Sequence, residues 1–136
     1  MRERARRAFG WGAWLVLASV IVQVTLAGLG VFANSEFFFW HSSVNGAVVF
    51  FLPLLLILVG WLGRVPIRLR WLTAAVPALV VLQSLLLVPY HMNAHGVLRA
   101  ISALHVVNAF VIFWVAFELV DRTRRYLATP EAGGAV

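Results

Sequence analysis

The segment Leu104-His105-Val106-Val107-Asn108-Ala109-Phe110 governs the interpretation of the whole chain. It places a histidine and an asparagine on one helical face near the start of the last long apolar run. The segment Trp40-His41-Ser42-Ser43-Val44-Asn45-Gly46-Ala47 repeats this pattern at the start of an earlier run. Polar groups inside a membrane span are costly and are by default read as functional. The two segments therefore predict a matched pair of functional histidines.

The composition predicts one integral membrane domain. The chain has 136 residues, of which 62% are hydrophobic and 12% charged, and its mean hydropathy is +0.93. It contains no cysteine, which excludes disulfides, iron–sulfur clusters and thiolate haem ligands. The net charge of +6 comes from short arginine clusters between apolar runs, which indicates membrane topology and argues against nucleic-acid binding.

Four apolar runs are long enough to span a bilayer. The first covers about 24 residues, roughly 36 Å as a helix, and is predicted to be a retained span, not a cleaved signal peptide. The sequence thus predicts an all-α, four-transmembrane-helix bundle within residues 9–125, built from two repeated helical hairpins. The predicted spans are 9–32, 41–63, 71–88 and 97–120, with a basic segment at 1–8 and a disordered tail at 126–136.

The arginine distribution predicts the orientation of the bundle. Ten arginines lie in the N-terminus, the middle turn and the C-terminal flank, whereas Arg99 alone lies in the other two loops. The positive-inside rule then predicts a multi-pass protein of the cell membrane with both termini cytoplasmic. All four histidines, with Glu36 and Arg99, are expected on or near the outer face.

The two hairpins carry the same polar residues in the same order. Gln23 precedes His41 and Asn45, and Gln83 precedes His105 and Asn108; the glutamine-to-histidine separations are 18 and 22 residues. A duplicated hairpin would place spans 2 and 4 across the bundle from each other, where bundles build cofactor sites. The prediction is that His41 and His105 are the axial ligands of one haem b, with Asn45 and Asn108 beside it. The alternative is that these side chains only link neighbouring helices.

Counting along the helices gives the two histidines different depths. Arg64 lies 23 residues beyond His41, whereas Asp121 lies 16 residues beyond His105. At 1.5 Å per residue these separations are about 34 and 24 Å, so a mismatch of roughly 10 Å is expected. Helix tilt and a kink at Pro53 could absorb part of it.

Other polar residues at the predicted outer face have alternative interpretations. Arg99 either is a plain loop charge or pairs with a haem propionate. His91 and His95 either belong to a solvated loop, form a metal site with Glu36 or Met92, or replace one axial ligand.

The repeated pattern of Gln23, His41, Gln83 and His105 resembles one half of haem A synthase. In that family each four-helix half places a histidine pair, from its second and fourth spans, around a haem near the outer face. The resemblance covers about residues 22–117 and carries over to His41 and His105 alone. The family's outer-loop glutamate has no clear match, because Glu36 lies five residues before His41. With no second half, the chain is expected to be a stand-alone module or a dimer that rebuilds the larger architecture.

Three functions follow from these patterns. The first is a b-type cytochrome-like protein that binds haem for electron transfer or haem handling, either as a membrane oxidoreductase or without catalysis. The second is a cofactor-free four-helix subunit that packs against a partner complex. The third is an outer-face metal-handling protein. The expected partners are the lipid bilayer and either a second copy or a membrane redox protein.

Overall fold

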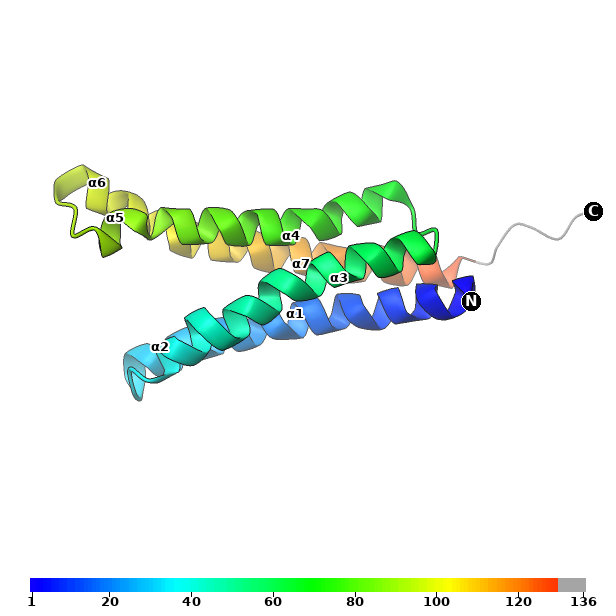
Figure 1. Cartoon of the computed structure of the whole chain (residues 1–136), viewed down its shortest axis with the longest axis horizontal. Coiled ribbons are helices and arrows are strands. Elements are labelled where there is room, and N and C mark those ends of the chain that lie inside the picture. Colours follow the sequence, from blue (N-terminus) through cyan, green and yellow to red (C-terminus); the bar gives the residue numbers. More distant parts are fainter. Residues whose placement is uncertain (130–136) are drawn as a thin grey trace, which may run out of the picture.

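The computed structural model describes residues 1–129, and these form four long helical segments joined by short connections (Figure 1). The first segment is α1 (Arg2–Phe32), and the second consists of α2 (Phe37–Phe39), the π-helical η1 (Trp40–Asn45) and α3 (Gly46–Leu62). The third consists of α4 (Ile67–Leu86) and α5 (Val88–His91). The fourth consists of α6 (Gly96–Ala100), the 3-10 helix η2 (Ile101–Ala103) and α7 (Leu104–Ala128).

All four segments are long and apolar enough to cross a membrane. No strand occurs in residues 1–129. A helix satisfies its own backbone hydrogen bonds, which is why apolar runs of this length fold as helices in lipid. The predicted all-α four-helix bundle is confirmed, and the chain is a multi-pass membrane protein.

The helices run past several predicted limits. Residues 2–8, predicted as a basic flank, are already helical in α1, and residues 126–128, predicted as part of a disordered tail, belong to α7. Two i,i+4 ion pairs, Glu118–Arg122 and Asp121–Arg125, accompany the extension of α7. The rest of the predicted tail lies outside the described residues.

The bundle is a ring of four neighbours. The helix α1 packs against α3 and α7, and α4 packs against the same two helices, so α3 and α7 lie diagonally across the bundle. This is the arrangement expected for a repeated hairpin. The start of α1 and the end of α7 lie at one end of the bundle, called here the terminal end, and the connections through α2 and α5–α6 lie at the opposite, far end (Figure 1).

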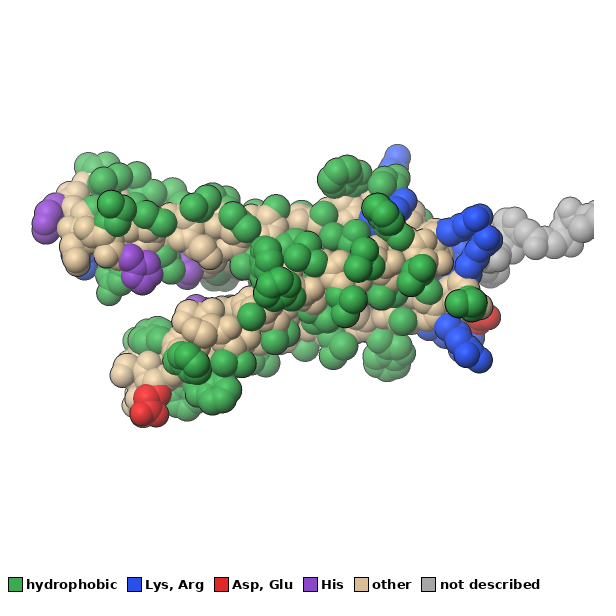
Figure 2. Space-filling model, in the orientation of Figure 1, with side chains coloured by type: hydrophobic (Ala, Val, Ile, Leu, Met, Phe, Trp, Pro, Cys, Tyr) green, Lys and Arg blue, Asp and Glu red, His purple; other side chains and the backbone are tan. Residues whose placement is uncertain are grey.

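The apolar core occupies only the half of the bundle near the terminal end. In α1 the buried apolar residues run from Phe9 to Val20, and in α7 they run from Ile112 to Val120. Toward the far end the two hairpins separate, and a notch with histidine side chains along its edges lies between them (Figure 2). The hairpins thus pack together at the terminal end and lie apart at the far end.

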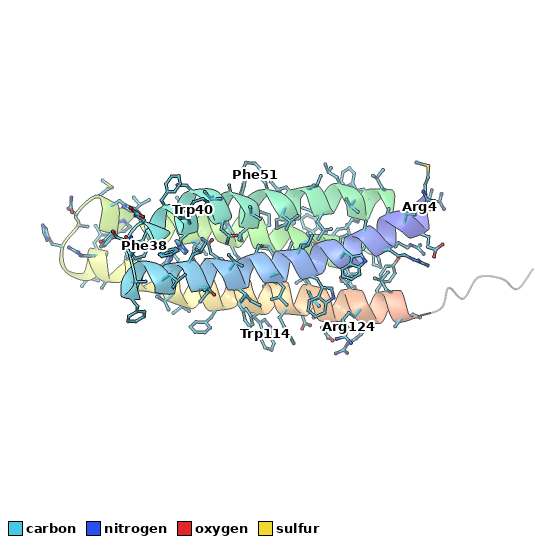
Figure 3. The ribbon with its side chains drawn as sticks, turned by 90° about the horizontal axis from the view of Figure 1, so that it is seen from below. Arg4, Phe38, Trp40, Phe51, Trp114 and Arg124 are labelled. Carbon is cyan, nitrogen blue, oxygen red and sulfur yellow. The ribbon has the colours of Figure 1, made fainter. Side chains whose placement is uncertain are left out.

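Apolar side chains also cover the outside of the bundle, as expected where lipid is the solvent. Phe51 and Trp114 are 63% and 64% exposed and point away from the bundle on opposite sides (Figure 3). Phe38 and Trp40 lie at the far end and Arg4 and Arg124 at the terminal end, which brackets the apolar span with interfacial residues.

Arg6 contacts both the end of α3 and the last turn of α7. Its Nε donates to the Gly63 carbonyl at 3.0 Å, and its guanidinium lies 5.8 Å from the centre of the Tyr126 ring. Gly63 lies 22 residues beyond His41, and Tyr126 lies 21 residues beyond His105. The predicted depth mismatch was counted from Asp121, which lies inside a helix that continues to Ala128 and does not mark its end.

Candidate functional site

In the first hairpin, Gln23, His41 and Asn45 form one hydrogen-bonded cluster. The Nδ1 atom of His41 lies 2.9 Å from the backbone carbonyl of Gln23. Because a carbonyl only accepts, this contact makes Nδ1 the protonated ring nitrogen. Asn45 donates from Nδ2 to Gln23 Oε1 at 2.7 Å and to the Ser19 carbonyl at 2.8 Å. The cluster fixes both the orientation and the tautomer of the imidazole.

The second hairpin repeats this cluster with Gln83, His105 and Asn108. The Nδ1 atom of His105 lies 3.2 Å from the Gln83 carbonyl. Asn108 donates to Gln83 Oε1 at 2.6 Å and to the Leu79 carbonyl at 2.9 Å. Ser19 and Leu79 each lie four residues before their glutamine, so the two clusters use equivalent backbone positions.

A π-helical turn reconciles the different spacings of histidine and asparagine. His41 and Asn45 are four residues apart, whereas His105 and Asn108 are three apart. The first pair lies in η1, where the Gly46 N–H bonds to the His41 carbonyl five residues back. A π-turn holds one more residue per turn than an α-turn, so both spacings give the same hydrogen bonds.

His41 and His105 line the same cavity, which has a volume of about 220 Å³ and lies between the two hairpins. Both rings are partly buried. With Nδ1 bonded to a glutamine carbonyl, Nε2 is the nitrogen of each ring that remains available. Within residues 1–129 neither Nε2 atom has a hydrogen-bond partner. The remaining wall is almost entirely aliphatic; it includes Val20, Val24, Val49, Val80 and Ile112.

The asparagines and glutamines have different places at this cavity from those expected. Asn45 and Asn108, predicted beside the cofactor, do not line the cavity and instead hold the glutamine side chains. Gln23 and Gln83 line the cavity and supply the carbonyls that orient the histidines, and their side chains also bond to the neighbouring helix. The repeated order of glutamine, histidine and asparagine was the signal that could have identified all three residue types.

The other predicted site residues lie at the far end. His91 ends α5, with its ring centre 5.5 Å from that of Tyr90, and His95 is the exposed residue before α6. Arg99 lies in α6, with its guanidinium 5.3 Å from the centre of the Tyr90 ring. Glu36 is exposed before α2.

The structure does not bring His91, His95 and Glu36 together. No group of three or more histidine, aspartate or glutamate side chains that could hold a metal ion is found in residues 1–129. Glu36 therefore does not join His91 and His95 in such a group.

The comparisons give a family match but no function. A family model described as a family of unknown function (DUF6220) matches residues 23–89. This segment includes the first cluster and Gln83, and it ends before His105. Neither the curated proteins nor the solved structures gave a match.

Proposed function

We propose that the chain is an integral membrane haem-binding protein, a b-type cytochrome-like module in which His41 and His105 are the axial ligands of one haem b. One observation carries the proposal. Two histidines from equivalent positions of two hairpins line one cavity, and each is bonded through Nδ1 to a backbone carbonyl. Bound between them, the haem iron would supply one-electron redox chemistry.

The hydrogen bonds prepare both imidazoles for ligation. A metal-binding histidine almost always donates its second ring N–H to a carbonyl, carboxylate or water, which orients the ring and raises the basicity of the ligating nitrogen. The Gln23 and Gln83 carbonyls are such acceptors for His41 and His105. In the neutral form of each ring, this arrangement leaves the Nε2 lone pair for iron.

The space around the histidines suits a flat, apolar macrocycle. The cavity adjoins a groove of about 400 Å³ between α1 and α7, and the two share Val24, Val106 and Ala109. Together they fall within the range of about 300–1,000 Å³ that is usual for cofactor sites. Aliphatic walls favour the porphyrin face, and the open far end leaves room for propionates.

The orientation is part of the same proposal. The arginine bias supports a cytoplasmic location of both termini, and hence an outer location of the far end of the bundle. Arg99 would then lie at the interface, where a guanidinium can pair with a propionate. A periplasmic reporter fused after Arg125 is expected to be inactive, whereas one inserted between Pro89 and Arg99 is expected to be active. The reverse pattern would overturn the orientation.

An absorption spectrum tests the function directly. Protein purified in detergent, or reconstituted with haemin, is expected to show a Soret band and sharp α and β bands after reduction. A sharp α band indicates six-coordinate, low-spin iron, as two imidazole ligands require. A colourless protein that haemin cannot reconstitute would refute the proposal.

The competing function is a cofactor-free subunit of a larger complex. It is favoured by the same hydrogen bonds, because polar links between helices also stabilise membrane bundles without any ligand. It predicts that the purified protein takes up no haemin and that a pull-down recovers a partner protein in fixed stoichiometry. The spectrum and the pull-down thus separate the two functions.

A further inference from the structure

A second candidate site lies at the terminal end of the bundle, far from the histidine cavity. A groove of about 230 Å³ runs between α1 and α7, with Trp11 and Trp14 on one wall and Leu127 on the other. It shares Arg7 and Leu127 with a wider depression of about 800 Å³. The two hollows therefore adjoin each other, one mainly apolar and the other rich in charge.

The wider depression and the mouth of the groove are strongly basic. Together they are lined by five arginines and one acid: Arg2, Arg6, Arg7, Arg64, Arg124 and Glu3. Glu3 pairs with Arg7. The ion pairs within residues 1–129 leave Arg2, Arg64 and Arg124 without an acidic partner. Among residues 1–129, basic side chains therefore outnumber acidic ones around these two hollows, which suits an anionic ligand.

A buried hydroxyl in the groove wall gives an independent indication. Thr123 is 1% exposed, and its Oγ1 atom has no hydrogen-bond partner in the described part of the chain. Thr25, Thr73 and Thr129 each donate to the carbonyl four residues back, so Thr123 alone departs from this pattern. A buried donor without a partner is destabilising, and an oxygen of a bound ligand would relieve that cost once the Thr123 side chain rotates toward the groove.

We infer that these two adjoining hollows together bind one anionic phospholipid. Its phosphate would face Arg7 and Arg124, an ester or phosphate oxygen would accept from Thr123, and an acyl chain would lie along Trp11 and Trp14. Basic pockets between membrane helices recognise anionic headgroups, and tryptophans occupy the adjoining interfacial layer. Lipid binding at this site requires a bilayer but no haem, so its test is independent of the test of the proposed function.

Lipid titration of the purified protein, followed by native mass spectrometry, tests the inference. Phosphatidylglycerol is expected to bind at one copy per chain and at least about tenfold more tightly than phosphatidylcholine with the same acyl chains. The double variant Arg7→Gln/Arg124→Gln should lose about tenfold or more in phosphatidylglycerol affinity, because each arginine near an anionic headgroup contributes substantially. Arg4→Gln/Arg125→Gln removes the same charge from the same two helices, at residues that line neither hollow, and should change the affinity little.

A variant that leaves the charge of the protein unchanged distinguishes binding at this site from general electrostatic attraction. Thr123→Val keeps the shape of the side chain and removes the unpartnered hydroxyl, so it should weaken phosphatidylglycerol binding roughly two- to tenfold. Its melting temperature without lipid should stay level or rise, which would show that the fold is intact. Equal losses in both arginine pairs, or unchanged binding in Thr123→Val, would overturn the inference. So would full competition by glycerol 3-phosphate, since that anion has no acyl chain.

Discussion

The two hairpins build the same histidine cluster from different local structures. In the first, His41 lies in a π-turn, and the Gln23 amide donates to the His41 carbonyl at 2.7 Å. In the second, His105 lies in regular α-helix, and no corresponding bond from the Gln83 amide occurs within the described chain. The bonds common to both are those that orient the imidazole and hold the glutamine.

This difference shows which feature of the site is fixed. The spacing between histidine and asparagine varies by one residue, yet the hydrogen bonds around the ring do not. A π-turn is energetically poorer than an α-turn and is found frequently at functional sites. The first hairpin therefore keeps a less favourable turn whose effect is to preserve the orientation of His41.

The largest expected effect comes from removing either ring. His41→Ala and His105→Ala should each convert the low-spin spectrum to a high-spin one or abolish haem binding, because two axial ligands are needed for six coordination. Optical and electron paramagnetic resonance spectra measure the change. The helical content should persist, since apolar packing at the terminal end holds the bundle together.

His91→Ala and His95→Ala are the matched controls, because both side chains lie on the far-end connections. Each should leave the spectrum nearly intact. If His95→Ala abolished the low-spin signal while His41→Ala did not, the pairing of the two hairpins would be wrong.

Two deletions test whether the π-turn serves only to correct spacing. Deleting Ser43 gives the first hairpin the three-residue spacing of the second and should retain haem affinity in a regular α-helix. Deleting Val107 shortens the second spacing to two residues and turns Asn108 away from Gln83. Loss of such a supporting bond typically costs 10- to 100-fold in affinity. Haemin titration of both variants measures the contrast.

Similar losses in the two deletions would contradict this account. They would show that the π-turn itself, including the Gln23 bond to the His41 carbonyl, is required for binding.

The smallest effect is expected from the glutamines in the apoprotein. Gln83→Leu removes one side-chain hydrogen bond, to Asn108, and should lower the free energy of unfolding by about 1 kcal/mol. Gln23→Leu removes two, to Asn45 and to the His41 carbonyl, and should cost about twice as much. Unfolding equilibria in bicelles provide the comparison.

The asparagines supply an internal control for that comparison. Each keeps its second bond, to the carbonyl of Ser19 or of Leu79, so this contribution cancels between the two variants. Equal losses for Gln23→Leu and Gln83→Leu would show that the extra bond in the first hairpin adds no stability.

The sequence predicted the four helices and the matched histidines for physical reasons that do not depend on packing. Apolar runs of spanning length have no alternative to helix in lipid, because every backbone group must be satisfied. Polar residues are rare enough in such runs that the order of Gln23, His41 and Asn45, repeated from Gln83 onward, stood out. The diagonal placement of α3 and α7 then followed from the repeat.

Only the tertiary structure decided which of these residues line the cavity and which support the histidines. Helical periodicity assumes a uniform turn, so it could not show that a π-turn brings Asn45 to Gln23. Charges in the sequence suggested that the last span ended at Asp121, whereas α7 continues to Ala128, and the two histidines line one cavity. The cavity likewise arises because the hairpins pack at the terminal end and separate toward the far end. This arrangement depends on contacts between helices, which no single segment of sequence specifies.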